Sequence, residues 1–100
     1  RIANAKLVKD RGFTVDFEGK RFLALNTSTK GSMQFDSAVK EEHDGCLAFS
    51  WNGKAWGASF YGVPGKDVDM SVIAGKHGGG GHKSAAGCRF DKLPKELGGK

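Results

Sequence analysis

The sequence lacks the features that mark several large classes of protein. It contains two cysteines, Cys46 and Cys88, and no Cys-x-x-Cys pair, which is too few to hold a small secreted domain together by disulfides. No apolar run approaches the roughly 18 residues that a membrane-spanning helix needs, and no signal-peptide pattern follows Arg1. These absences favour a cytoplasmic protein with reduced thiols and no membrane contact. Because the sequence does not begin with Met, we expect it to be a piece of a longer protein.

The residues that are present suit one folded domain of modest size. Of the 100 residues, 38% are hydrophobic and 27% are charged, a balance typical of a globular rather than a disordered chain. Residues 1–35 carry seven basic and three acidic side chains, residues 36–70 three and six, and residues 71–100 six and two. The positive ends suit an anionic partner such as a nucleotide or nucleic acid, although a net charge of +5 also serves solubility alone.

Local patterns in the first half of the sequence predict a hairpin between two helical segments. Phe13, Val15 and Phe17 alternate with polar residues, which is the period of a half-buried strand. Ser32 is a suitable N-cap for a following helix. In chain order we expect a helix end at 2–8, a strand at 13–17, a turn at Glu18-Gly19, a strand at 21–26, a polar loop at 27–31 and a helix at 32–42.

Patterns in the second half predict another hairpin, a short helix and a glycine run. Asn52-Gly53 between two apolar segments indicates a two-residue type I′ turn, because both central residues of that turn need positive φ. Asp67 or Asp69 then caps a helix. We expect a strand at 46–51, a return strand at 54–61 with Trp56, Ala58 and Phe60 on one face, a helix at 68–75 and a helix at 81–86. The whole sequence predicts an α/β or α+β domain: a small mixed β-sheet built from hairpins with flanking helices, and a glycine-rich loop between two helices.

The most unusual feature is the run of four glycines, Gly78–Gly81. Glycine loses more backbone entropy on folding than any other residue, so four in a row are costly to order. Either the run is a flexible linker, or a ligand must approach the main chain without a Cβ in its way. In the second case, exposed N–H groups at the head of the helix expected at 81–86 would form an anion site. His82, Lys83 and Ser84 would then be side-chain donors beside it.

Other phosphate-binding and metal-binding patterns do not fit. A Walker A loop is excluded because a histidine separates the last glycine from the Lys-Ser pair. The Rossmann fingerprint fails because the glycines follow a helix rather than a strand. His43, Cys46, His77 and Cys88 do not have the spacing of a zinc site. We expect His43 and His77 to be surface histidines with satisfied hydrogen bonds.

Two adjoining stretches carry a more specific pattern. The first is Val68-Asp69-Met70-Ser71-Val72-Ile73-Ala74, and the second is Gly78-Gly79-Gly80-Gly81-His82-Lys83-Ser84-Ala85-Ala86-Gly87. Together they resemble the C-terminal, DHH-associated domain of the DHH phosphoesterases. That family includes RecJ-type exonucleases, hydrolases of short oligoribonucleotides, cyclic-dinucleotide phosphodiesterases and relatives of exopolyphosphatase. The preceding hairpins fit the same domain, so the resemblance covers most of the sequence.

The resemblance implies a division of labour. In such proteins an N-terminal domain holds divalent metals, usually manganese, and performs the hydrolysis, while the C-terminal domain grips the substrate with its glycine-histidine loop. This sequence contains no Asp-His-His. The resemblance therefore implies that residues 12–100 are the substrate-binding domain, that residues 1–11 end a linker helix, and that catalysis needs a DHH domain outside this sequence. No catalytic residue, metal ligand or cofactor is expected in this chain, and homodimerisation of the full protein stays open.

The resemblance also assigns the contacts to a substrate, which would be a short oligonucleotide, a nucleotide or another phosphorylated compound. These contacts would come from Gly78, Gly79, Gly80, Gly81 and His82, with Lys83, Ser84, Ser59 and Tyr61 beside them. Family members have an Arg near the end of the hairpin strand in a Ser-Leu-Arg-Ser-like stretch, where this sequence has Ser59-Phe60-Tyr61-Gly62. With Tyr61 in place of that arginine, the bidentate contact of a guanidinium with phosphate would be lost. A hydroxyl and a ring that can stack would take its place.

Two other functions stay open at this point. The chain could be a stand-alone nucleic-acid-binding module that uses its basic ends, or a metal-dependent enzyme in its own right. A DHH domain encoded upstream would favour the phosphoesterase, and bound metal in the purified chain would favour the enzyme.

Overall fold

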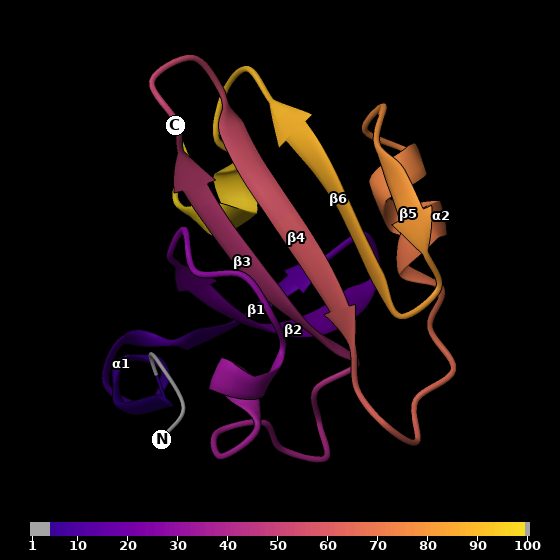
Figure 1. Ribbon diagram of the computed structural model, residues 1–100. Helices are drawn as coiled ribbons and strands as arrows, with labels where there is room; N and C mark the ends of the chain where they lie inside the picture. The colour runs from indigo at the N-terminus through magenta and orange to yellow at the C-terminus, as the bar shows by residue number, and fades with distance from the viewer. Residues whose placement is uncertain (1–4, 100) are drawn as a thin grey trace.

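The computed structural model describes residues 5–99 and contains a six-stranded mixed sheet with helical segments packed against it (Figure 1). In chain order the elements are α1 (Ala5–Arg11), β1 (Phe13–Phe17), β2 (Lys20–Asn26), the 3-10 helix η1 (Met33–Phe35), β3 (Gly45–Trp51), β4 (Trp56–Gly62), α2 (Met70–Gly75), β5 (Gly80–His82), β6 (Ala85–Phe90) and the 3-10 helix η2 (Lys95–Leu97). The strand order is β1-β2-β3-β4-β6-β5, with β2 and β3 parallel and the other neighbours antiparallel. The predicted α/β class with a small mixed sheet is confirmed. The helix expected at 2–8 is found from residue 5, and residues 2–4 lie outside the described part.

The tight turn between β1 and β2 follows from two residues with positive φ. Glu18 has φ 53° and Gly19 has φ 77°, and a two-residue hairpin turn of type I′ requires positive φ at both positions. Phe17 and Lys20 are therefore paired directly across the turn. The turn expected at Glu18-Gly19 is confirmed.

The hairpin of β3 and β4 is also confirmed, but its turn is not the two-residue turn expected at Asn52-Gly53. The Asn52 side-chain oxygen accepts hydrogen bonds from the backbone N of Lys54 (2.8 Å) and of Ala55 (2.9 Å). The Asn52 backbone N donates to the Ala55 carbonyl at 3.1 Å. The loop therefore spans four residues, because the asparagine side chain satisfies two of its amides.

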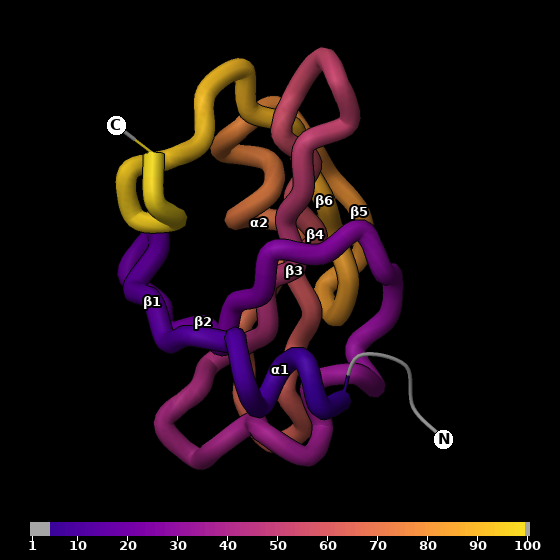
Figure 2. The backbone as a smooth tube through the Cα atoms, turned by 90° about the vertical axis from the view of Figure 1, so that its left-hand side faces the viewer, coloured from indigo at the N-terminus to yellow at the C-terminus, as the bar shows by residue number. Residues whose placement is uncertain are grey.

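Buried apolar side chains lie on both faces of the sheet. Figure 2 shows that different segments cover each face. The first face packs against α2 and the C-terminal turn, and its buried cluster is Phe17, Phe22, Ala24, Leu47, Phe49, Ala58, Phe60, Met70, Ile73, Ala74, Ala86, Cys88 and Leu97. The second face packs against α1 and the connection from β2 to β3, and its buried cluster is Val8, Leu23, Leu25, Phe35, Cys46 and Ala48. The strand residues of the second cluster belong to β2 and β3. The second face therefore has its buried core over β2 and β3 and not over β6 and β5.

Residues 27–44, here called the crossover, connect the parallel strands β2 and β3 without the helix expected at 32–42. That prediction is wrong, because the crossover has one 3-10 turn, in which the Phe35 N–H donates to the Ser32 carbonyl at 3.0 Å, followed by non-helical turns. An amphipathic helix needs a continuous apolar stripe against the core. Met33 is 63% exposed while Phe35 is fully buried, so the apolar residues here do not form such a stripe.

His43 fixes the end of the crossover from inside the protein. Its ring is 2% exposed, so the expectation of a surface histidine is wrong, although its hydrogen bonds are satisfied. The Lys40 backbone N donates to Nδ1 at 2.9 Å, so Nε2 carries the proton and donates to Thr14 Oγ1 at 2.9 Å. Burial lowers the pKa of His43 below its ordinary value, because desolvation disfavours the charged ring.

We expect mild acid to destabilise the fold through His43. Below pH 6.5, the ordinary pKa of histidine, the unfolded chain binds a proton that the folded protein does not. The free energy of unfolding therefore falls with decreasing pH, by at most about 1.4 kcal/mol per pH unit. Urea unfolding at about pH 7.5 and about pH 5.5 measures this fall. In His43→Gln the fall should shrink, since the other histidines are common to both proteins; an equal fall in both would contradict the prediction.

The helix expected after the second hairpin is α2, and it begins as predicted at an aspartate. The Asp69 carboxylate accepts a hydrogen bond from the Ser71 backbone N at 3.0 Å, which satisfies one of the free amides at the start of the helix. Of the two candidate caps, Asp69 is the one that the structure uses. The helix ends at Gly75, and two residues separate it from the glycine run.

The segment after α2 is a strand, so the helix expected at 81–86 is wrong. β5 pairs antiparallel with β6, and Gly81 lies opposite Ala86. A Cβ on Gly79 would overlap the Gly87 carbonyl oxygen, and a Cβ on Gly81 would overlap the backbone of Ala86. The absent side chains therefore let this segment lie directly against β6. The glycine run does not lead into a helix N-terminus.

Candidate functional site

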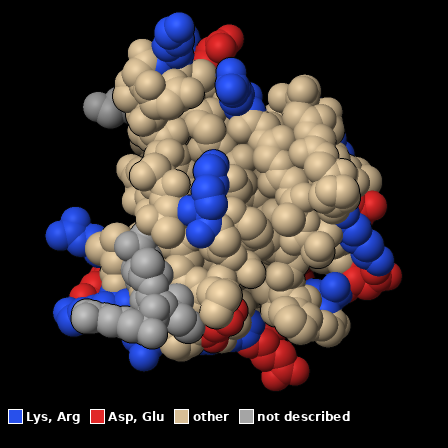
Figure 3. Space-filling model, in the orientation of Figure 1, with Lys and Arg blue, Asp and Glu red and all other residues tan. Residues whose placement is uncertain are grey.

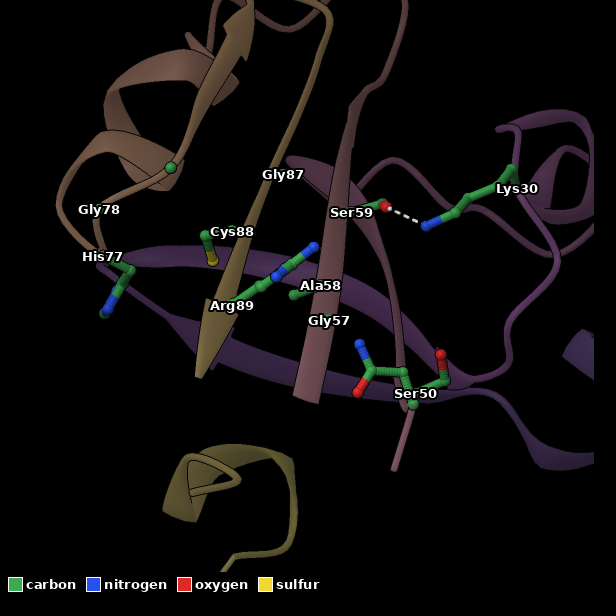
Figure 4. Close-up of a pocket in the computed structure, with 12 residues that line it drawn as sticks. Lys30, Ser50, Gly57, Ala58, Ser59, His77, Gly78, Gly87, Cys88 and Arg89 are labelled. Atoms are coloured by element: carbon green, nitrogen blue, oxygen red, sulfur yellow. Dashed lines mark hydrogen bonds between the residues drawn. The ribbon is translucent and has the colours of Figure 1, made fainter. Parts of the chain in front are cut away.

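A hollow of about 520 Å³ lies where the sheet carries no buried core on its second face, over β4 and β6 (Figure 4). Its residues come from four parts of the chain: the crossover, the end of β3 with its turn, the pair β4 and β6, and the loop after α2. We call it the Lys30–Arg89 hollow after the two cations at its margin. Segments that are distant in sequence thus meet at one surface.

Small residues form the floor of the Lys30–Arg89 hollow. In the register of β4 and β6, Gly57 lies opposite Arg89 and Ser59 lies opposite Gly87. Side chains alternate between faces along a strand, and the intervening Ala58 belongs to the buried cluster of the first face. Gly57, Ser59, Gly87 and Arg89 therefore share the second face. The two glycines leave the main chain bare between a hydroxyl and a guanidinium.

Two cations border this floor from different segments. Lys30 lies on the crossover, and its Nζ approaches Ser59 Oγ to 3.4 Å (Figure 4). Arg89 extends from β6 and is exposed. In residues 5–99 neither side chain takes part in an ion pair. Acidic side chains lie mainly toward the rim of this side of the molecule (Figure 3), so the two positive charges are available to an anion.

The loop after α2 forms one wall of the hollow, and its histidine anchors that wall to the core. The His77 ring packs against Phe17 and Phe90, with centroid distances of 5.4 and 5.0 Å. Its Nε2 lies 3.9 Å from a Glu18 carboxylate oxygen and makes no hydrogen bond within the described residues. His77 is thus a half-buried packing residue and not the satisfied surface histidine that we expected. Gly78 next to it has φ 81° and open space around it.

The structure divides the predicted site residues between two places. Gly78, Gly79 and Ser59 line the Lys30–Arg89 hollow. His82, Lys83 and Ser84 line a second hollow of about 550 Å³, here called the His82 hollow, together with residues of the 62–68 loop. Gly80 and Gly81 lie on β5 and line neither hollow.

The His82 hollow is more apolar, and its lysine is already paired. The Lys83 ammonium lies 2.6 Å from an Asp67 carboxylate oxygen, and this hydrogen bond raises the pKa of Lys83 and lowers that of Asp67. Val63, Pro64 and Val68 supply apolar lining. An anion in the His82 hollow would have to compete with Asp67 for the lysine.

Tyr61 does not line the Lys30–Arg89 hollow. Its ring packs at the edge of the buried cluster of the second face, and its hydroxyl oxygen accepts a hydrogen bond from the Gly31 backbone N at 2.9 Å. Tyr61 is therefore bonded to the crossover. A guanidinium is present on the neighbouring strand, at Arg89 of β6.

Sequence reasoning missed Lys30 and Arg89. A signal for Arg89 was present, since Ala86, Cys88 and Phe90 alternate with Gly87 and Arg89 and so place the arginine on the polar face of a strand. Expecting a helix at 81–86 concealed that alternation. No local signal identified Lys30, because its position depends on the path of the crossover over the sheet.

Two kinds of reactive group can be checked in the described residues, metal ligands and cysteine thiols. Residues 5–99 contain no group of three or more His, Cys, Asp or Glu side chains that could hold a metal ion. Burial raises the pKa of Cys88, which lines the hollow, to about 11, and that of Cys46 to about 12, so neither is a nucleophilic thiolate at neutral pH. No helix in the described residues is long and apolar enough to cross a membrane.

Comparison with known proteins gives matches in structure but not in sequence. No protein-family model and no curated protein matches the sequence. The fold is similar to that of PggH, a pGpG-specific phosphodiesterase from Vibrio cholerae, with a TM-score of 0.64 and 13% identity over 88% of this chain and 32% of that one. It is also similar to an uncharacterized protein from Helicobacter pylori G27, with a TM-score of 0.57 and 18% identity over 80% of this chain and 23% of that one. The chain therefore has a fold that forms about a third of the first protein and about a quarter of the second.

Proposed function

We propose that this chain is the substrate-binding domain of a DHH-type phosphodiesterase and that the Lys30–Arg89 hollow holds a phosphate of a nucleotide substrate. The observation that carries the proposal is the pair of cations, neither with a carboxylate partner in residues 5–99, that border a floor of bare main chain. An anion placed between them gains charge-assisted hydrogen bonds, which are about twice as strong as neutral ones. The fold shared with a pGpG-specific phosphodiesterase supports a nucleotide as the ligand.

The residues around the two cations suit the remaining parts of a nucleotide. Ser50 and Ser59 offer hydroxyls, and Asn52 offers the NH2 group of its amide as a donor, because its oxygen already accepts from Lys54 and Ala55. The flat backbone at Gly57 and Gly87 leaves room for a sugar or a base above the sheet. These groups would orient a phosphorylated ligand whose charge is held by Lys30 and Arg89.

We further propose that a dinucleotide extends from the Lys30–Arg89 hollow toward the His82 hollow. The two hollows lie at different points along β4, since Gly57, Ala58 and Ser59 line the first and Gly62 lines the second. Five strand residues span about 16 Å, which suits two nucleotides. Contacts at the far end would then come from His82, Lys83 and Ser84, and the remaining predicted site residues, Gly80 and Gly81, would approach the ligand from β5.

Hydrolysis in this proposal belongs to a part of the protein outside this sequence. The similar phosphodiesterase chain is about three times as long as the region that matches here. A preceding DHH domain with manganese or another divalent metal would supply the reaction, and residues 5–11 of α1 would lie nearest to it in sequence. We propose the cytoplasm as its compartment, since both cysteines are free thiols, and a homodimer as a state to be tested on the whole protein.

Titration of the 100-residue chain with pGpG, followed by amide chemical shifts, tests the proposal. We expect the largest shifts at Gly57, Gly78 and Gly87, because these glycines line the hollow that would hold the phosphate. Binding should weaken as salt is raised, since cations hold the ligand. The same titration with inorganic phosphate measures how much of the effect the phosphate alone produces.

Remote glycines provide the internal control for that titration. Gly19 and Gly98 lie in turns outside both hollows, and their amides should not move. Shifts confined to residues 80–84 would place the phosphate in the His82 hollow instead. No saturable shift with pGpG, at any salt concentration tested, would contradict a nucleotide-binding role.

A further inference from the structure

The backbone on both sides of Lys30 is held by two side chains from other elements. On the C-terminal side, the Gly31 N–H donates to the Tyr61 hydroxyl oxygen at 2.9 Å. The Gln34 side-chain nitrogen donates to the Thr29 and Gly31 carbonyl oxygens, each at 2.9 Å. The Lys30 side chain itself reaches the Ser59 hydroxyl in the floor of the hollow. The loop is therefore fixed at the residues that flank the lysine.

Both holding side chains are themselves well anchored. Gln34 is 3% exposed and lies on η1. Tyr61 lies on β4, two residues after Ser59, so the two side chains project from the same face of one strand. The Tyr61 ring packs against the buried cluster of the second face. The strand β4 thus carries two hydroxyls, that of Ser59, which Lys30 approaches, and that of Tyr61, which binds the backbone beside Lys30.

We infer that Tyr61 is a positioning residue that sets the affinity of the Lys30–Arg89 hollow for an anion by holding the crossover over Ser59. The inference rests on the proposed function, because it concerns affinity at that hollow. It gives Tyr61 a role without a contact to the ligand: its hydroxyl binds Gly31, and Lys30 makes the contact.

A physical reason for such a support is the flexibility of what it supports. Lysine has a long side chain that loses about 2 kcal/mol of conformational freedom when it is fixed. Gly31 has φ 102° and open space around it, and glycine can leave that conformation easily. Without the bond to Tyr61 the backbone beside Lys30 would also have to be ordered by the ligand. Holding it in advance raises affinity by preorganisation.

A double-mutant cycle with pGpG as the probe tests the inference. We expect Tyr61→Phe to weaken binding about fivefold in the otherwise unchanged chain, because the phenylalanine keeps the ring but cannot accept the Gly31 bond. In the Lys30→Ala background the same change should have no further effect. In the Arg89→Ala background it should again weaken binding about fivefold, because Arg89 is held by β6 and not by the crossover.

Gln34→Met gives a second, independent variant with a side chain of similar length. It removes the two bonds to Thr29 and Gly31, and its effect on binding should likewise vanish in the Lys30→Ala background. Thermal unfolding and the amide spectrum of each variant establish that it is folded before its affinity is compared. A purely structural role for Tyr61 would change unfolding in all backgrounds but would not single out Lys30.

The outcomes separate this inference from the proposed function. If Lys30→Ala and Arg89→Ala both leave the affinity for pGpG unchanged, the proposed function fails. If those two variants bind more weakly while Tyr61→Phe binds normally, the hollow is a nucleotide site and the positioning role is wrong. A Tyr61→Phe effect that persists without Lys30 would also overturn it, since the hydroxyl would then act on the ligand by another route.

Discussion

Alanine at both Lys30 and Arg89 is expected to weaken the binding of pGpG by about a hundredfold or more, because in the proposed site each cation makes a charge-assisted contact that contributes about 1.5–3 kcal/mol. The two side chains come from the crossover and from β6, and they do not form a bond with each other in the described structure. Their separate effects should therefore add approximately. Isothermal titration of the double variant and the two single variants measures this directly.

Two exposed basic residues outside the hollow provide matched controls for charge. Lys20→Ala and Arg11→Ala, alone and combined, remove the same charges from the ends of β2 and α1. They should leave affinity within about twofold, because exposed charges farther apart than a Debye length are largely screened at about 0.15 M salt. If the control pair weakens binding as much as the pair in the hollow, net charge rather than the hollow attracts the ligand.

Alanine at Gly79 is expected to lower the free energy of unfolding by about 2–3 kcal/mol, the upper part of the range of about 1–3 kcal/mol for overpacking a tightly packed site. An added Cβ would overlap the Gly87 carbonyl oxygen and crowd the Cys88 backbone. The loop after α2 would have to move away from β6, and this displacement would also separate β5 from the sheet. Urea unfolding of the variant and of the unchanged chain measures the difference.

The neighbouring glycine supplies the control for that substitution. A Cβ on Gly80 would have open space around it, and its φ is not positive, so Gly80→Ala should change stability by no more than about 0.5 kcal/mol. Equal losses for the two variants would mean that lost glycine flexibility, and not close packing on β6, explains the glycine run. The Gly80→Ala variant also tests whether the ligand contacts β5. If the variant is as stable as the unchanged chain but binds pGpG poorly, the ligand lies against β5.

The strands could be predicted from sequence because apolar and polar residues alternate along a strand that has one buried and one exposed face. Phe13, Val15 and Phe17 alternate with polar residues and form β1 as expected. The return strand places Ala58 and Phe60 in the first cluster as expected. Period-two alternation needs only local information, since a strand with one buried face must show it.

The glycine segment and the crossover could not be predicted in the same way. Glycine has no side chain, so Gly80 and Gly81 cannot show the alternation of buried and exposed side chains that indicates a strand. Instead, β5 forms because this segment packs closely on β6. The crossover is held by specific polar bonds, such as those of Gln34 and His43, rather than by an apolar stripe. Such bonds depend on partners distant in sequence. Because the path of the crossover depends on those distant partners, Lys30 could be placed at the candidate site only from the structure.

The parallel pairing of β2 and β3 has a consequence for how this domain can change. Two parallel neighbours cannot be joined by a tight turn, so the chain must return across the sheet before the second strand begins. The topology itself therefore delivers a loop to the surface where β4 and β6 are open, whatever residues occupy its tip. Substitutions between Thr27 and Gly31 could exchange one ligand preference for another while the strand pairing stays as it is, which makes this return path the natural place for specificity to diverge among proteins of this architecture.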